Sequence, residues 1–288
     1  MHAEIGIFGG SGFYDFTDGA ETLEELVVDT PFGAPSAPVT IADVGGRRVA
    51  FIPRHGRDHQ YAPARVPARA NLWALRTLGV RQVLGPCAAG SLAPDIHPGD
   101  FVVLDQLVDR TWGRPDTYYD AGEVHHVSFA DPYCPVVAQQ AVESGERVGV
   151  RMHASGTVVV IPGPRFSTRA ESRSYRAQGW HVVNMTQYPE AYLARELGMH
   201  YAGIALVTDY DTGVEHDAGV PPVTQAEVFA FFESNVHRVR ALLHDLVPRL
   251  PDEPTGCACA SAVGPLGAHD DAPGDDAPGS GGRDAGAR

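Results

Sequence analysis

Short apolar runs that stop at glycine, proline or a polar cluster recur along the chain, and they limit the folds that it can adopt. The runs "VAFIPRHG", "GTVVVIPGPR" and "YAGIALVTDYD" are apolar in succession rather than alternating with polar residues. This pattern is typical of strands that are buried on both faces of a sheet. Stretches with helical spacing of apolar residues lie between the runs, at 64–79, 189–198 and 224–247. We therefore predict an α/β fold, with a central mixed β-sheet flanked by helices.

Sequence signals also mark the last helix and the end of the folded region. Thr224 with Glu227 three residues later predicts a capping box at the start of that helix. Toward the carboxyl terminus the composition changes to Gly, Pro, Ala and Asp, which cannot bury enough apolar surface to offset the entropy of ordering. We predict a single domain over 1–250, an extension over 251–264 with a Cys-X-Cys pair, and a disordered acidic tail over 265–288.

Composition excludes several classes of function. The net charge of −14 argues against a nucleic-acid-binding protein, which needs a basic surface. All 22 lysine-or-arginine positions are arginine, which excludes a Walker A loop and a Schiff-base lysine. No apolar run reaches about 18 residues and no secretory segment opens the sequence, so we predict a cytoplasmic protein without a membrane partner. The small number of cysteines is typical of a protein in a reducing compartment. The pair Cys257 and Cys259 alone does not predict a zinc site, because zinc needs four ligands.

Polar groups at the carboxyl ends of the predicted strands are candidates for a ligand site, because ligands bind there in α/β sheets. The first strand ends in "GGSG", which includes Ser11, and such a turn suits an anion. Another ends at Arg54 and His55, where a guanidinium offers a planar fork to phosphate oxygens. Thr186 follows a third strand and adds a hydroxyl. Together these groups predict a site for free phosphate, although each alone also fits a structural turn or a surface ion pair.

Two carboxylates, Asp209 and Asp211, follow the apolar run "IALV". Residues i and i+2 of a strand point to the same face, so both side chains are expected to aim the same way. Burial and a nearby second carboxylate raise the pKa of a carboxyl group, which can then act as a general acid. Two solvated loop acids are the alternative on these residues alone. Beside a phosphate site the pair favours phosphorolysis of a nucleoside, because glycosidase carboxylates lie on opposite sides of a sugar.

His55 and His59 have i, i+4 spacing, which raises the question of a metal. They lack the intervening Glu of the zinc-protease motif and lie among Gly and Pro residues, which argues against a helix. We predict no metal and no cofactor, with inorganic phosphate as a co-substrate.

The segments "IGIFGGSG", "PRHGRDH", "GPRFSTRAES", "VVNMTQYPEAYLARELG" and "TDYDTGVEH" carry a resemblance to a known family. In this order they resemble the methylthioadenosine phosphorylases of the trimeric purine nucleoside phosphorylase class, over residues 4–250. The resemblance implies a purine nucleoside phosphorylase-like fold that assembles as a homotrimer or a dimer of trimers. It implies cleavage of 5′-methylthioadenosine by phosphate to adenine and 5-methylthioribose 1-phosphate, in purine and methionine salvage.

The resemblance also implies roles for individual residues. The implied phosphate site comprises Ser11, Arg54, His55, Cys87, Ala88 and Thr186. The implied nucleoside site comprises Phe166, Ser167, Asn184, Met185, Val228, Asp209 and Asp211, with His126 supplied by a neighbouring subunit. Asp209 is expected to face N7 and the 6-amino group of the purine, with Asp211 as the supporting catalytic residue. Family members often carry Thr at position 87, so Cys87 departs from the pattern.

Substrate preference is expected to depend on the acids and on the last helix. A carboxylate accepts a hydrogen bond from a 6-amino group, whereas an Asn there donates to a 6-oxo group, so "TDYD" indicates a 6-aminopurine. By resemblance, the helix start near Gln225, Val228 and Phe229 holds the methylthio end of the substrate. The alternatives are a 6-oxopurine nucleoside or methylthioinosine phosphorylase, and a non-catalytic purine sensor.

Overall fold

The computed structural model describes residues 2–10, 13, 21–120, 122, 124–212 and 224–262. Ser11 and the predicted tail over 265–288 lie outside these residues. Among the helices of the described part, none is both long and apolar enough to cross a membrane.

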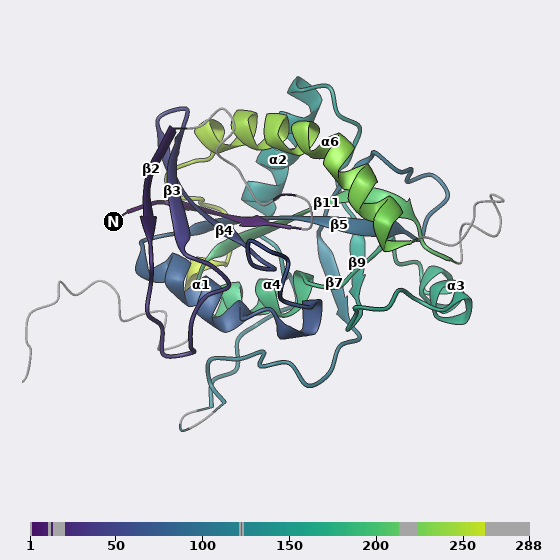
Figure 1. The fold of residues 1–288 in the computed structure, drawn as a ribbon, viewed down its shortest axis with the longest axis horizontal. Coiled ribbons are helices and arrows are strands. Elements are labelled where there is room, and N and C mark those ends of the chain that lie inside the picture. The colour runs from purple at the N-terminus through teal and green to yellow at the C-terminus, as the bar shows by residue number, and fades with distance from the viewer. Residues whose placement is uncertain are drawn as a thin grey trace, which may run out of the picture.

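One mixed β-sheet forms the centre of the fold (Figure 1). The path along the sheet is β2-β3-β4-β1-β5-β10-β9-β7, while β11 joins it through β5 and continues to β6 and β8. The strands are β1 (Ile5–Gly9), β2 (Glu21–Leu26), β3 (Val39–Val44), β4 (Arg47–Pro53), β5 (Gln82–Ser91), β6 (Phe101–Val103), β7 (Gln106–Asp109), β8 (Met152–His153), β9 (Thr157–Val160), β10 (Val182–Asn184) and β11 (His200–Tyr210). The strands β1, β4, β5 and β11 run parallel to their neighbours in this group, whereas β10 pairs with β5 antiparallel. The predicted mixed sheet is confirmed.

Helices cover both faces of the sheet. The described helices are α1 (Ala68–Thr77), α2 (Pro135–Arg147), α3 (Arg169–Ala177), α4 (Gln187–Glu196) and α6 (Gln225–Leu246), with short 3-10 turns η1 (Pro63–Arg65), η2 (Val247–Arg249) and η3 (Ala260–Ala262). Figure 1 shows α2 and α6 on one face, and α1 and α4 on the other. One buried apolar cluster lies under each helix pair, which explains why the central strands are apolar throughout.

The predicted start of the last helix is confirmed. The Thr224 hydroxyl accepts a hydrogen bond from the backbone N–H of Glu227 at 3.3 Å. The Glu227 carboxylate in turn accepts one from the backbone N–H of Thr224 at 2.9 Å. This reciprocal pair satisfies two N–H groups that a helix start leaves without an intrahelical partner.

Some elements have no signal in the apolar periodicity. The strand β2 is exposed and acidic along most of its length, and α3 buries only Ser172 among its residues. A capping box at Thr168 and Glu171 begins α3, so the Thr-x-x-Glu spacing was the available signal for that helix.

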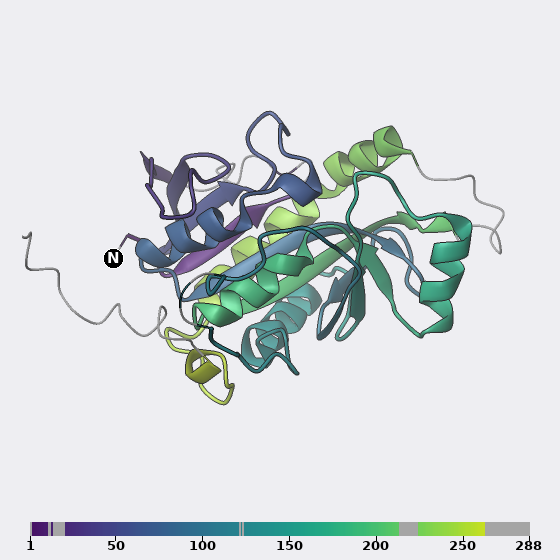
Figure 2. The ribbon, with the colours of Figure 1, turned by 90° about the horizontal axis from the view of Figure 1, so that it is seen from below.

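The chain after α6 packs back onto the domain, as the last coloured segment in Figure 2 shows. Arg47 donates to the Leu250 carbonyl at 2.8 Å, and Gln82 donates to the Pro251 carbonyl at 2.6 Å. Cys259 then enters the apolar cluster under α2 and α6. The described part of the predicted extension, 251–262, therefore contacts the body of the domain.

Candidate active site

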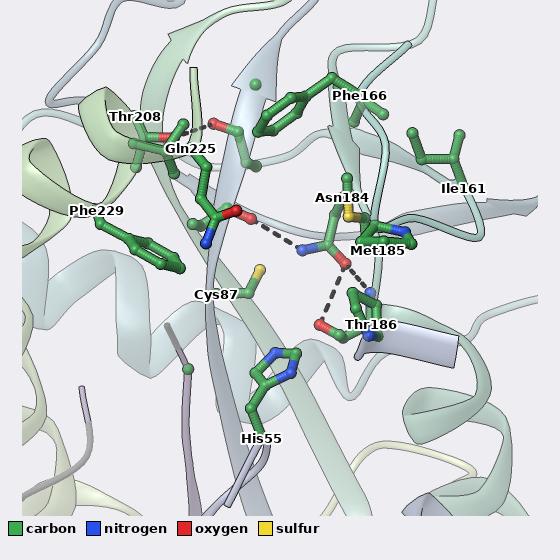
Figure 3. Close-up of a pocket in the computed structure, with 18 of the residues that line it drawn as sticks. His55, Cys87, Ile161, Phe166, Asn184, Met185, Thr186, Thr208, Gln225 and Phe229 are labelled. Atoms are coloured by element: carbon green, nitrogen blue, oxygen red, sulfur yellow. Dashed lines mark hydrogen bonds between the residues drawn. The ribbon is translucent and has the colours of Figure 1, made fainter. Parts of the chain in front are cut away.

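A cavity of about 390 Å³ opens where β1, β4, β5, β10 and β11 end, beside the start of α6 (Figure 3). Most of the predicted site residues line it: Arg54, His55, Cys87, Ala88, Phe166, Ser167, Asn184, Met185, Thr186, Asp209, Asp211 and Val228. Ser11 lies outside the described residues, and its neighbour Gly10 lines the cavity. His126 is exposed and does not line the cavity of its own chain. The sheet therefore brings polar groups from distant parts of the sequence to one place.

Arg54 lies buried at the floor of the cavity and is fixed by Glu190. Its Nη2 donates to Glu190 Oε2 at 2.9 Å, and its Nε donates to Glu190 Oε1. The hydroxyl of Tyr201 also donates to Glu190 Oε2, at 2.8 Å. Burial by itself lowers the pKa of Arg54, but the adjacent Glu190 carboxylate outweighs it, and the net pKa lies above the ordinary value. The guanidinium is therefore a fixed positive charge.

Arg54 retains donors for a ligand. A third bond runs from Nη1 to the Pro86 carbonyl at 3.1 Å, so these contacts use three of the five N–H donors that a guanidinium carries. A Cβ at Gly10 would lie 3.3 Å from Arg54 Nη1, so a side chain at this position would cover that edge of the guanidinium. Glycine therefore leaves this edge accessible to an anion in the cavity.

His55 is held as a neutral imidazole. Its Nδ1 lies 2.8 Å from the Tyr61 carbonyl, and because a carbonyl only accepts, Nδ1 carries the proton. Burial and the positive charge of Arg54 outweigh the opposing effect of the Tyr61 hydrogen bond and lower the pKa of His55 to about 4. The remaining nitrogen, Nε2, is then a hydrogen-bond acceptor at neutral pH, which suits a protonated oxygen of phosphate.

Cys87 is a buried thiol and not a nucleophile. Burial raises the pKa of Cys87 to about 12, and its Sγ accepts a hydrogen bond from Gln187 Nε2 at 3.4 Å. A thiol with this pKa stays protonated near neutral pH, and the thiolate is the reactive form of cysteine. Cys87 therefore contributes shape and a weak polar contact to the cavity.

Asn184 organises the site through its own hydrogen bonds. Its Oδ1 accepts from the backbone N–H groups of Thr186 at 2.7 Å and Gln187 at 2.8 Å. Its Nδ2 donates to the Ala88 carbonyl at 2.9 Å. Together these bonds join the turn before α4 to β5 and fix Thr186 at the cavity wall. Figure 3 draws the contacts between Asn184 and Thr186. Asn184 is predicted to bind substrate, and its contacts in the structure are those of a positioning residue.

Asp209 and Asp211 both line the cavity, as their i, i+2 spacing predicts. The pairing of β11 with β5 shifts between Val207 and Asp209, so a β-bulge precedes the acids. Both side chains lie against Gly90, where a Cβ would be 3.0 Å from Asp209 Oδ1 and 3.4 Å from Asp211 Cβ. The Thr208 hydroxyl donates to Asp209 Oδ2 at 2.6 Å. Glycine at position 90 therefore makes room for both acids on one wall.

Two further side chains near the acids fit recognition of a flat ring. Phe166 lines the cavity with its aromatic face half-buried. Ser167 is buried, and within the described residues its hydroxyl has no hydrogen-bond partner. A buried hydroxyl without a protein partner is costly unless a ligand or water satisfies it. Ser167 is therefore a candidate contact for a polar group of the ligand.

The start of α6 closes the other side of the cavity. Gln225, Val228 and Phe229 all line it, as the resemblance implies. The ring of His59 packs edge-on against Phe229 with centroids 5.3 Å apart, and its centroid lies 4.7 Å from that of His55. The two histidines that raised the question of a metal thus form part of a ring cluster that walls the cavity.

Two positioning residues were missed by sequence reasoning. Glu190 holds Arg54 across a separation of 136 residues in the sequence. Arg114 donates to the carbonyls of Met185 at 2.9 Å, Tyr188 at 2.6 Å and Pro162 at 2.9 Å, and so fixes the loops on both sides of the cavity wall. Neither residue lies in a local motif that indicates its partner, so only the tertiary structure reveals these contacts.

A family model described as the phosphorylase superfamily matches residues 4–248. The chain belongs to the phosphorylase superfamily. It is 53% identical over 260 residues to the S-methyl-5′-thioadenosine phosphorylase of Mycolicibacterium smegmatis, covering 90% of this chain and 96% of that protein. It is 50% identical over 273 residues to a purine nucleoside phosphorylase of Streptomyces coelicolor, covering 92% and 95% of the two chains.

Solved structures of this superfamily share the fold. The methylthioadenosine phosphorylase of Schistosoma mansoni in complex with adenine superposes with a TM-score of 0.84 and 37% identity, covering 90% of this chain and 96% of that one. A mutant of the Schistosoma mansoni enzyme in complex with methylthioadenosine has a TM-score of 0.83 and 37% identity. The family and fold that the sequence motifs predicted are confirmed, and the chain is a transferase of the nucleoside phosphorylase type.

Proposed function

We propose that this phosphorylase cleaves 5′-methylthioadenosine with inorganic phosphate, and releases adenine and 5-methylthioribose 1-phosphate. The observation that carries the proposal is the polarity of one cavity. Arg54, His55 and Thr186 lie on one side, and the two carboxyl groups packed on Gly90 lie on another. Groups that suit an oxyanion and groups that suit a purine thus lie on separate walls of the cavity. The relatives named as methylthioadenosine phosphorylases support this substrate.

Phosphate would bind to the donors that the protein's own contacts leave on Arg54. The Thr186 hydroxyl and the turn at Gly10 supply further polar groups on that wall, and we assign Ser11 to the same turn. His55 Nε2 accepts a hydrogen bond from a protonated phosphate oxygen. The fixed charge of Arg54 and the neutral state of His55 need no rearrangement when phosphate arrives, which favours electrostatic preorganisation.

The purine would lie between Phe166 and the acid pair. Asp209 faces N7 and the 6-amino group, Asp211 supports it, and the Ser167 hydroxyl finds a partner on the purine edge. The sugar would lie over Met185. As the glycosidic bond stretches, the sugar becomes oxocarbenium-like and the electron pair of the bond leaves with the purine. Asp209 protonates N7 of the purine in the same step. A phosphate oxygen then forms the new bond to the anomeric carbon. The chain's own residues and phosphate complete this scheme, so we propose no cofactor or catalytic metal.

The methylthio end would lie against the start of α6. Val228, Phe229 and His59 give that end an apolar lining, whereas Gln225 adds one polar group. Gln225 and the relative named as a purine nucleoside phosphorylase favour one second candidate, cleavage of nucleosides with a 5′-hydroxyl or a 6-oxopurine. In a site built around it, a hydrogen bond from the 6-amino group to a carboxylate can favour 6-aminopurines over 6-oxopurines by about 10⁴ in kcat/KM.

We also propose a cytoplasmic homotrimer or dimer of trimers in which His126 completes the cavity of a neighbouring subunit. His126 is exposed on a segment that also displays Trp112 and Val124, with 72% and 70% of their surfaces exposed. Large apolar side chains with that exposure fit burial in a subunit contact. The molar mass in solution and the effect of His126→Ala on the Michaelis constant test this arrangement.

A substrate panel tests the reaction. Initial rates of base release would be measured for methylthioadenosine, methylthioinosine, adenosine and inosine, each with and without phosphate. We expect methylthioadenosine to react fastest and only with phosphate. Base release that does not need phosphate would identify a hydrolase, no release would identify a purine sensor, and faster release of a 6-oxopurine would overturn the assigned substrate.

A further inference from the structure

Four side chains of types that bind metals meet at the amino end of β11, whereas the acid pair lies at its carboxyl end. They are Cys134, His200, Cys257 and Cys259, and their ligand atoms all lie within 4.8 Å of one another. Three of the four residues are buried, and Cys257 is partly exposed. We infer that this cluster is a structural zinc site of the Cys₃His type.

The separations among Cys134, His200 and Cys257 match the edges of a tetrahedron around zinc. With Zn–S of about 2.3 Å and Zn–N of about 2.0–2.1 Å, the edges of a tetrahedral site are about 3.8 Å between two sulfurs and about 3.5 Å between sulfur and nitrogen. In this structure Cys134 Sγ lies 3.8 Å from Cys257 Sγ. His200 Nδ1 lies 3.4 Å from Cys134 Sγ and 3.3 Å from Cys257 Sγ. These three side chains are thus already placed at ligand separations, and Cys259 Sγ lies within 4.8 Å of each of their ligand atoms.

The set of ligands indicates which metal binds and what it does. Thiolates with one imidazole in a closed set of four are typical of structural zinc, whereas catalytic zinc keeps a position open for water. Cys134 is 0% exposed, Cys259 1% and His200 6%, so little space remains for a substrate. Three thiolates and a neutral imidazole leave a net charge of −1 around Zn²⁺, and each thiol releases its proton to solvent when the ion binds.

The ligands come from three separate parts of the fold. Cys134 is the residue before α2, and its backbone N–H donates to the Tyr201 carbonyl at 2.8 Å. His200 is the first residue of β11. Cys257 and Cys259 come from the segment after α6, just before η3. A bound ion would therefore attach the carboxyl-terminal segment to the body of the domain.

A disulfide is the competing use of these thiols. All four cysteines of the sequence, including Cys87 in the cavity, are free thiols in the structure. A disulfide would use two of the clustered sulfurs and give His200 no role, whereas zinc uses all four ligands. The Cys-X-Cys pair alone was too sparse to predict a zinc site, and the fold supplies the two missing ligands. The catalytic proposal is unaffected, because no ligand of this cluster lines the cavity.

Metal content measures the site directly. The full chain would be produced in a reducing cytosol and purified without chelator, and zinc would be counted by mass spectrometry of the elements. We expect about one zinc per chain, less than about a tenth in a Cys257→Ser/Cys259→Ser double variant, and an unchanged content in the matched control Cys87→Ser. Wild-type protein with less than a tenth of an equivalent, or equal loss in the control, would overturn the inference.

Cobalt provides a readout that needs no variant. Wild-type protein stripped of metal and refilled with Co²⁺ is expected to show intense visible bands of tetrahedral cobalt and sulfur-to-cobalt charge transfer. The weak bands of six-coordinate cobalt would contradict the site. Peptide mapping of the same wild-type preparation is expected to find free thiols at 257 and 259, and a disulfide between them would contradict it as well.

Discussion

The two ends of β11 perform opposite tasks on one strand. Asp209, near the carboxyl end, lines an open cavity that receives groups from several strands. His200, the first residue, lies about 30 Å away along an extended strand and belongs to a buried cluster with three cysteines. The carboxyl end of β11 can exchange ligands with solvent, whereas the cluster at its amino end is closed.

The difference shows how a sheet and a tail create sites by separate routes. The carboxyl ends of β1, β4, β5 and β11 meet because the strands run parallel, so sheet polarity alone gathers their polar groups. The direction of the strands does not explain the cluster at the amino end of β11. Its cluster forms because the chain returns after α6, and Cys134 and Cys257 are 123 residues apart. One site follows from topology, and the other follows from the docking of a terminal segment.

The two ends are also connected. Tyr201, next to His200, donates to Glu190, and Glu190 holds Arg54 on the cavity floor. Gly85 permits this contact, since a Cβ there would lie 2.1 Å from the Tyr201 hydroxyl.

Replacing Glu190 with Ala is expected to have the largest effect. It leaves the buried Arg54 charge without its partner, and breaking a buried pair in this way costs about 3–5 kcal/mol of unfolding free energy. Urea unfolding measures this change. Glu25→Ala removes a pair with Arg57 that is about half exposed, and should cost less than about 1 kcal/mol. Equal losses for both variants would show that the floor of the cavity is not held by this pair.

Acid is expected to destabilise the cavity end through His55. The pKa of His55 falls from 6.5 to about 4 on folding, so the unfolded chain binds the extra proton between these values. The free energy of unfolding therefore has its full contribution from neutral His55 above pH 6.5. It falls by roughly 3 kcal/mol as the pH decreases toward 4. Unfolding at several pH values compares wild type with His55→Asn, which should lose this part of the slope. His237→Asn, at an exposed position outside the cavity, is the matched control and should retain the wild-type slope.

Asp209→Asn is expected to reduce kcat/KM for methylthioadenosine by more than tenfold, at least about 1.4 kcal/mol of transition-state stabilisation. The amide cannot protonate N7, and it presents a donor where the 6-amino group needs an acceptor. The ratio of inosine to adenosine cleavage should rise in the same variant. Steady-state kinetics beside Asp95→Asn, an exposed acid outside the cavity, supply the comparison. Unchanged kinetics would refute the role of Asp209.

The smallest kinetic effect is expected at the other end of the strand. The Cys257→Ser/Cys259→Ser variant should unfold at a lower temperature, yet its kcat/KM should stay within about twofold of wild type because these residues do not touch the cavity. Thermal unfolding and kinetics on the same preparation measure both values. A large loss of activity with intact folding would show that the two ends of β11 are coupled.

Several features of the site were predictable because they are local. The apolar runs identify strands that are buried on both faces, and the residue after each run marks a carboxyl end, which is how Arg54, Thr186 and Asp209 were found. The capping box at Thr224 was predictable because its two partners lie three residues apart. The bulge before Asp209 could not be predicted from the sequence, because it depends on how β11 pairs with β5.

By itself, the sequence determined the fold class, the family, and the groups that the strands deliver to the cavity, since apolar periodicity and motifs are written in neighbouring residues. Only the tertiary structure decided that Glu190 fixes Arg54, that Asn184 orients Thr186, and that His200 joins the cysteines. The physical reason is that each of these contacts joins elements whose meeting depends on packing of the whole sheet or on the return of the chain end. Periodicity tells which face of an element is buried, and packing decides what that face meets.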